Sequence, residues 1–233
     1  MKKILLLLLS IIMLQATIQA TTDHKARLIE SNGVTQLMMD GKPWLILGGE
    51  LGNSSASSPE DVAAIFPKLR DMGLNCILVP AYWELIEPEE GRFDFATTDA
   101  VIDEAIKNNL KVVFLWFGAW KNSMSCYAPS WLKEDYKKYP RAMTKSGKPL
   151  EIASAFSENV FKADSTALTT WLRHTTGRDS LGTVAMLQIE NEIGMLEDAR
   201  DHSHPPLRLR VASLTQRLFL LEKLLDGAEG GED

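Results

Sequence analysis

An acidic segment at the end of a predicted strand is the strongest candidate for catalysis. The apolar stretch 183–189 predicts a strand, near whose end Gln188, Glu190 and Glu192 occupy alternate positions. That alternation places the three polar side chains on one face. Buried carboxylates are costly unless they are paired, hydrogen-bonded or used in a reaction, so acids gathered here indicate an active-site mouth. A strand that runs out into a solvated loop is the alternative.

Glu50, Trp83 and Glu84 also follow predicted strands. Glu50 comes after the apolar run 44–48, and the glycines before it let the backbone approach a ligand. Trp83 and Glu84 come after the strand predicted over 75–79, at the position where a ligand would enter. A simple strand-ending turn at Glu50 and an ordinary anchored loop at Trp83 and Glu84 are the alternatives.

An aromatic segment follows the strand predicted over 112–117. Trp120 and Tyr127 lie in it beside amide and hydroxyl side chains. Aromatic faces next to such groups suit a sugar, because its C–H faces stack on the rings while its hydroxyls form hydrogen bonds. For Trp116 and Trp131 we favour packing in the core.

Composition and motif content exclude several classes of function. The chain has 233 residues, 45% apolar and 24% charged, as in an ordinary globular protein. Its net charge of −6 and the lack of a basic run argue against nucleic acid. No glycine-rich phosphate loop follows a predicted strand, and we expect no cofactor. The spacing of Asp198, His202 and His204 is weak evidence for a metal, so we expect a solvated loop and no metal site.

Strands and helices alternate along the chain. The predicted elements are strand 44–48, helix 57–73, strand 75–79, helix 97–109, strand 112–117, irregular segment 118–164, helix 165–176 and strand 183–189. This rhythm predicts an α/β fold with a parallel sheet. Because the candidate residues follow strand ends, we favour a (β/α)8 barrel of the TIM type. Such a barrel has eight strands, and the sequence predicts only about the first four βα units.

The two ends of the chain are predicted to lie outside this barrel. Residues 1–20 have a basic start, an apolar run and a small residue at Ala20, which is the pattern of a cleaved signal peptide. We therefore expect export to the periplasm or the extracellular space, and no membrane attachment after cleavage. Residues 21–203 would form the half barrel. Apolar residues spaced by four and three, from Leu207 and Val211 to Leu225, predict an amphipathic helix in the tail 204–233.

The two cysteines are too few for a disulfide scaffold. Cys76 lies in an apolar run and is expected in the core. Cys126 lies in a predicted loop and is expected to be a free thiol.

Three segments resemble bacterial exported β-galactosidase-like enzymes of glycoside hydrolase family 35 and the related family 42. They are QIENEIG over 188–194, the stretch 83–95 with its Glu-Pro-x-x-Gly-x-Phe-Asp-Phe pattern, and WFGAWKNSMSC over 116–126. The resemblance covers about residues 27–203. It implies that Glu192 is the acid/base and that Asn191 contacts the sugar ring. Asn191 then requires the strand to depart from ideal alternation.

The resemblance implies retaining hydrolysis of terminal β-galactosides in a plant or host glycan. The residues expected to contact substrate are Glu50, Trp83, Glu84, Trp120, Glu190 and Asn191. The family's nucleophile is a Glu after the seventh strand, so we expect it to be absent from this chain and the chain to be an inactive fragment. Many family members carry Ala-Glu where this chain has Ala119-Trp120, which leaves the exact sugar open.

Two other functional classes stay open. One is a half barrel that binds a glycan without cleaving it. The other is a non-functional truncation whose tail after Ser203 arose from a shifted reading frame. In a half barrel the first and fourth strands are open sheet edges, which favours self-association.

Overall fold

The computed structural model describes residues 26–192, 197–198 and 200–203. The chain divides into two compact units, Met1–Leu45 and Ile46–Asp233. Among the described residues, no helix is both long and apolar enough to span a membrane.

The first unit contains a small antiparallel sheet in the order β1-β2-β3. Its strands are β1 (Arg27–Ser31), β2 (Val34–Met39) and β3 (Lys42–Pro43). Both connections are two-residue turns, Asn32-Gly33 and Asp40-Gly41, whose residues all have φ between 53° and 75°. Such left-handed pairs are the geometry of tight hairpins, and Asn-Gly and Asp-Gly are the residues that adopt it most readily. The sequence interpretation noted the Asp40-Gly41 turn but missed this sheet.

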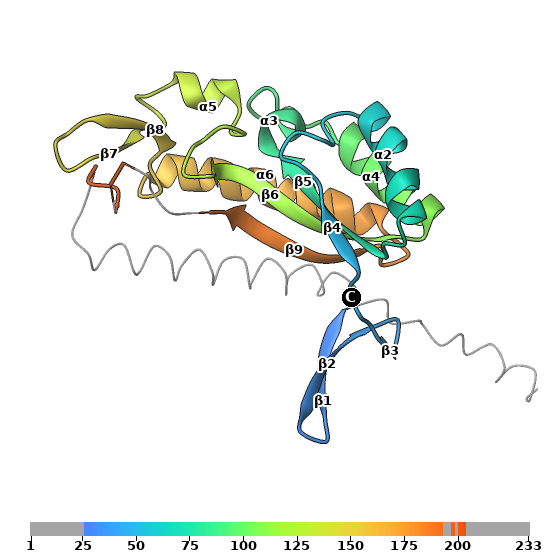
Figure 1. Cartoon of the computed structure of the whole chain (residues 1–233). Helices are drawn as coiled ribbons and strands as arrows, with labels where there is room; N and C mark the ends of the chain where they lie inside the picture. The colour runs from blue at the N-terminus through green and yellow to red at the C-terminus, as the bar shows by residue number, and fades with distance from the viewer. Residues whose placement is uncertain (1–25, 193–196, 199, 204–233) are drawn as a thin grey trace, which may run out of the picture. The chain divides into compact units, whose positions relative to one another are not determined.

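The second unit is built on a parallel sheet in the order β4-β5-β6-β9. The strands are β4 (Gly48–Glu50), β5 (Cys76–Tyr82), β6 (Lys111–Lys121) and β9 (Val184–Asn191). The long helices α2 (Pro59–Asp71), α4 (Ala96–Asn108) and α6 (Glu158–Arg178) lie in the connections between them (Figure 1). The predicted α/β class with a parallel sheet is confirmed.

The helices begin where local signals place them. The Ser58 side chain caps α2 by accepting a hydrogen bond from the Asp61 amide, and Pro59 occupies the first turn. Val62 and Phe66 then bury the same face of α2. Helix α4 ends at Asn108 and is capped by Asn109, whose φ of 53° is the left-handed conformation typical of a helix C-cap.

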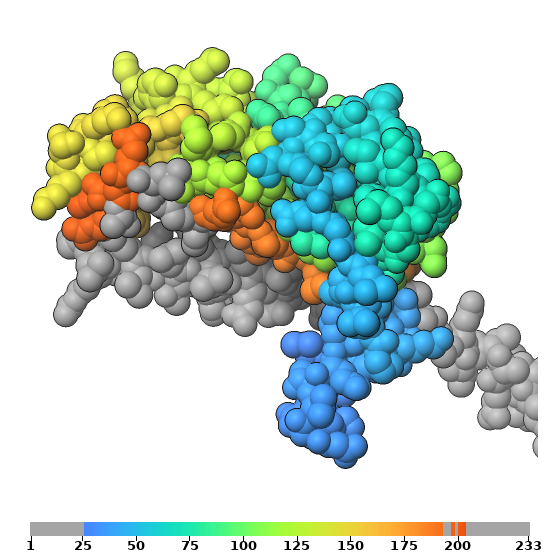
Figure 2. Space-filling view, in the orientation of Figure 1, coloured from blue at the N-terminus to red at the C-terminus, as the bar shows by residue number. Residues whose placement is uncertain are grey.

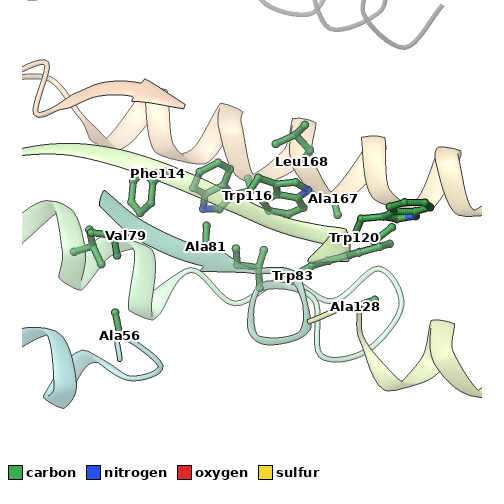
Figure 3. Close-up of a cluster of buried hydrophobic side chains, with 14 of the residues drawn as sticks. Ala56, Val79, Ala81, Trp83, Phe114, Trp116, Trp120, Ala128, Ala167 and Leu168 are labelled. Carbon is green, nitrogen blue, oxygen red and sulfur yellow. The ribbon is translucent and has the colours of Figure 1, made fainter. Parts of the chain in front are cut away.

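One face of the sheet forms the core against the helices, and we call it the helix face. Phe114 and Trp116 of β6 both pack on Trp171 of α6. The ring centroid of Trp171 lies 5.1 Å from that of Phe114 and 5.4 Å from that of Trp116. Figure 3 shows Trp116 and Phe114 among the buried side chains of this cluster. The buried indole nitrogens are satisfied: that of Trp171 donates to Thr98 and that of Trp116 donates to Asp164.

The first predicted strand is wrong in position. Residues 44–47 lie outside any strand, and β4 covers only Gly48–Glu50. Leu45 is 76% exposed and Leu47 is 53% exposed, so this apolar run is not buried. Apolarity alone predicted burial there, whereas pairing with β5 begins only at Gly48.

The segment predicted to be irregular contains several ordered elements. They are the short helix α5 (Ser130–Glu134) and the hairpin of β7 (Arg141–Met143) and β8 (Pro149–Ala153). Another short helix, α3 (Trp83–Ile86), lies outside this segment and directly follows β5. Helix α6 also starts earlier than predicted, because Ser157 caps it by accepting from the Val160 amide. The predicted leader 1–20 and tail 204–233 lie outside the described residues. Figure 2 shows the described surface from one side.

Candidate active site

The carboxyl end of β9 has an unusual backbone. Glu190 and Glu192 have φ of 60° and 49°, a left-handed conformation that is uncommon for residues other than glycine. Such strain persists only where the surroundings hold it, and it is concentrated at functional sites. The expected departure of this strand from ideal alternation is therefore present, and it falls on both sides of Asn191.

A tight turn at the end of β6 holds the end of β9. Lys121 and Met124 exchange two backbone hydrogen bonds, and the central residues Asn122 and Ser123 have φ of 54° and 61°. The Ser123 amide donates to the Glu192 carbonyl at 3.3 Å. Segments about 70 residues apart in sequence are thereby joined at the edge of the sheet where the strands end.

Two side-chain contacts add to this connection. The Lys121 ammonium donates to Oδ1 of Asn191 at 2.5 Å. The Trp120 amide donates to Oε2 of Glu190 at 3.0 Å. Glu190 and Asn191 are half-buried and Glu192 is exposed, so the acid predicted to donate a proton is accessible while its neighbours are held against β6.

Three aromatic rings, which we call the aromatic cluster, come from the ends of β5 and β6 and from the segment after β6. Tyr82, Phe117 and Tyr127 pack with centroids 5.2 to 6.0 Å apart. Tyr82 and Phe117 are buried, and Tyr127 is partly exposed above them. The Lys121 ammonium lies 4.7 Å from the centre of the Phe117 ring, which is a cation–π contact.

The aromatic cluster also joins the other strand ends. The hydroxyl of Tyr127 lies 3.0 Å from Oγ of Ser54, which follows β4. The carbonyl of Tyr127 accepts from the amide of Glu84, which follows β5. Loops after β4, β5 and β6 are thus in contact, and Lys121 extends the connection to β9.

Two of the expected substrate contacts are wrong. Trp83 is completely buried and donates its indole N–H to Glu87 at 2.8 Å. Trp120 is 9% exposed and donates its indole N–H to the Ala153 carbonyl at 3.2 Å. Both belong to the hydrophobic core, in which Figure 3 labels them. Neither ring offers a face to a ligand.

Strand alternation explains the error at Trp83. Tyr82 is the last residue of β5 and packs in the aromatic cluster, so the next side chain points to the helix face. The same alternation could have identified Tyr82 from the sequence. Core packing is confirmed for Trp116, which is fully buried, while Trp131 is partly buried and packs against the core.

Glu84 lies beside the aromatic cluster in a partly buried position. Its carboxylate is 3.7 Å from the Lys133 ammonium. Burial raises the pKa of the Glu84 carboxyl, and the nearby Lys133 charge opposes part of that effect. A carboxyl in this environment accepts a proton more readily than one in water.

Glu50 ends β4 and is exposed. Glu50 pairs with Leu78 of β5, and Leu78 pairs with Val113 of β6. Val113 in turn pairs with Met186 of β9. Glu50 is therefore level with the middle of β9 along the strand direction, and not with Glu192.

Comparison with known proteins identifies the family. Residues 36–224 match the family model described as Glycosyl hydrolases family 35. The chain belongs to glycosyl hydrolase family 35. This is a TIM-barrel family, in keeping with the parallel sheet observed here. The match runs beyond Ser203, where the sequence interpretation ended the resemblance.

Two curated relatives align with shorter parts of the chain. A protein named "Beta-galactosidase" from Xanthomonas manihotis is 32% identical over 82 residues, which is 34% of this chain and 14% of the relative. "Beta-galactosidase 11" from Arabidopsis thaliana is 29% identical over 104 residues, 43% of this chain and 12% of the relative. The chain therefore aligns with less than a fifth of the length of these two relatives.

The last described residues dock on the β7–β8 hairpin. Asp198 accepts from the Lys145 amide at 2.9 Å and lies 3.4 Å from His202, whose own amide donates to the Met143 carbonyl. Asp201 is buried and accepts from the Met143 amide. Asp198 and His202 thus pack on a hairpin and not in a solvated loop; His204 lies outside the described residues. In the described part of the chain, no group of three or more potential ligands is placed to hold a metal.

Proposed function

We propose that this family 35 protein acts on terminal β-galactosides as a retaining glycosidase, with Glu192 as its acid/base. The observation that carries the proposal is the Asn191-Glu192 pair at the carboxyl end of β9, held by the β6 turn. The names of the two aligned relatives support β-galactosides as the substrate class. Catalytic residues of TIM barrels lie at this end of the strands.

In the proposed reaction, Glu192 first donates its proton to the glycosidic oxygen. A second carboxylate attacks the anomeric carbon as the bond to the leaving group breaks, and a glycosyl-enzyme forms. Glu192 then takes a proton from the water that hydrolyses this intermediate. The two carboxyl groups must lie about 5–5.5 Å apart. The resemblance assigns the second one to a position after the seventh strand of the barrel.

The neighbours of Glu192 supply binding and order. Asn191 faces the sugar ring in this proposal, and the exposed part of Tyr127 offers a surface on which a C–H face of the sugar stacks. Glu190 is engaged by the Trp120 amide, so its role is to hold the strand end in place.

A carbohydrate-binding half barrel without turnover is the second candidate. The observation that favours it is that the other carboxylates predicted at the site are paired, hydrogen-bonded or at a different level of the sheet. Glu84 pairs with Lys133, Glu190 accepts from Trp120, and Glu50 lies level with Met186. A chain that holds the acid/base and sugar contacts but no positioned nucleophile would bind a galactoside and leave it intact.

Hydrolysis of an aryl β-galactoside, measured beside galactose binding by calorimetry, separates the candidates. Glu192→Gln is compared with Glu89→Gln, which changes an exposed carboxylate paired with Arg92. Hydrolysis that Glu192→Gln abolishes and Glu89→Gln preserves supports the glycosidase. Galactose binding without hydrolysis supports the binding module, and the absence of both contradicts the two proposals.

Export and self-association complete the proposal. The leader predicted over 1–20 directs the chain to the periplasm or beyond, and Edman sequencing of the exported protein should begin after Ala20. Within the described sheet, β4 and β9 are the edge strands. Unpaired edges invite pairing with another chain, so sedimentation should show concentration-dependent association. An intact Met1 terminus, or a strictly monomeric chain, would contradict the respective proposal.

A further inference from the structure

Lys121 is a buried cation whose hydrogen bonds go to two side-chain amides. Lys121 is the last residue of β6 and is 5% exposed. Its ammonium lies over the Phe117 ring. The ammonium donates to Oδ1 of Asn122 at 2.6 Å and to Oδ1 of Asn191 at 2.5 Å. An ammonium only donates hydrogen bonds, so it requires the oxygen of each amide.

This requirement determines which way the Asn191 amide is turned. The amide has one accepting oxygen and one donating NH2 group on the same planar carbon. With the oxygen held by a cation, the opposite orientation would bring N–H groups against an ammonium. The Nδ2 group of Asn191 is therefore turned away from Lys121.

We propose that Lys121 is the positioning residue that orients Asn191 so that its N–H donors, and not its oxygen, meet the substrate. The inference rests on the proposed function, in which Asn191 contacts the sugar ring. It implies that the group recognised by Asn191 is a sugar hydroxyl that accepts a hydrogen bond.

The backbone around Asn191 is held independently of Lys121. Trp120 donates to the Glu190 carboxylate and Ser123 donates to the Glu192 carbonyl. These two contacts position the chain on each side of Asn191 but leave its side chain free to turn. Removal of the Lys121 ammonium should therefore change the amide orientation more than the path of the strand.

Lys111 provides a matched control at the other end of the same strand. Its ammonium donates to the Gly182 carbonyl at 2.7 Å, just before β9. Both lysines thus connect β6 to the region of β9, one at each end. Lys111→Met and Lys121→Met remove the same charge and the same kind of donor.

Nuclear magnetic resonance of the full chain tests the orientation directly. The Asn191 NH2 signals are assigned by their loss in Asn191→Ala. We expect rigid, dispersed signals in the unmodified chain, mobile signals in Lys121→Met and no change in Lys111→Met. Rigid signals in a folded Lys121→Met would overturn the proposal. If that variant does not fold, the proton signal of the Lys121 ammonium is measured in the unmodified chain. Slow exchange with solvent, together with magnetisation transfer to Asn191, supports the proposal. Rapid exchange contradicts it.

Galactose binding by the same variants gives a second readout. Loss of one neutral hydrogen bond corresponds to about 3- to 10-fold weaker affinity. Lys121→Met should show this loss, Lys111→Met should not, and Lys121→Met should add nothing in an Asn191→Ala background. Equal affinity in Lys121→Met and the unmodified chain overturns the positioning role. If no galactoside binds although Lys121 holds the Asn191 amide, the proposed function fails and the positioning stands.

Discussion

Replacement of Glu87 by alanine should destabilise the chain because this buried carboxylate accepts two hydrogen bonds. Its Oε2 accepts from the Trp83 indole and its Oε1 from the Gly91 amide, both at 2.8 Å. Trp83 is completely buried, so no water replaces the lost partner, whereas Gly91 is exposed. An unsatisfied buried donor costs about 1–3 kcal/mol. With a smaller loss at Gly91, the unfolding free energy of Glu87→Ala should fall by about 2–3 kcal/mol.

Urea and thermal unfolding followed by circular dichroism measure this loss. In a chain of this size each kcal/mol lowers the melting temperature by about 2–4 °C, so a decrease of about 4–12 °C is expected. Glu87→Gln keeps one accepting oxygen and should lose about half as much. Glu89→Ala, which removes an exposed pair with Arg92, should change stability by less than about 0.5 kcal/mol. Equal stability of Glu87→Ala and Glu89→Ala would refute the reasoning.

Three further predictions follow from local packing and titration. Gly118→Ala should lower stability by about 1–3 kcal/mol in urea unfolding, because the added Cβ would lie 2.6 Å from Oδ1 of Asp164; an unchanged midpoint would contradict this. Burial raises the pKa of Glu84, so its ionised form is disfavoured in the folded chain and its contribution to stability is lost as pH rises through that pKa. Glu84→Gln should therefore gain stability relative to the unmodified chain at pH 7, with the difference vanishing below about pH 4. Burial also raises the pKa of the Cys76 thiol to about 11, whereas Cys126 is exposed. A thiol reagent at pH 8 should label Cys126 in the native chain and Cys76 only after unfolding; equal labelling of both would show that Cys76 is accessible.

The Glu87 contacts also explain one segment of the family resemblance. The Glu-Pro-x-x-Gly pattern places a carboxylate where it accepts from Trp83 and from Gly91, which closes the loop after α3. The sequence interpretation treated this region as a ligand entrance. The structure shows that Glu87 and Trp83 stabilise the loop, while Glu84 alone of the predicted pair lies near the site edge.

Elements with strong local signals could be predicted from the sequence. The cap and early proline at Ser58 and Pro59 placed the start of α2, and continuous apolar runs placed β5, β6 and most of β9. The acidic end of β9 drew attention to Glu190 and Glu192 for a local reason, since polar residues ending an apolar strand are uncommon. The roles of Glu192 and Asn191 came from the family resemblance. These features depend on neighbours within a few positions, which the sequence contains directly.

Tertiary structure decided which side chains meet at the end of the sheet. Trp83 is one position beyond Tyr82, and a shift of one residue moves a side chain to the opposite face of a strand. The contact between Lys121 and Asn191 joins residues 70 positions apart, and it depends on the register of β6 with β9 and on left-handed turns at both strand ends. No local pattern specifies such a register, because pairing energy depends on which strands lie side by side. The sequence by itself therefore determined the candidate acid, and the packing of strand on strand decided what holds it.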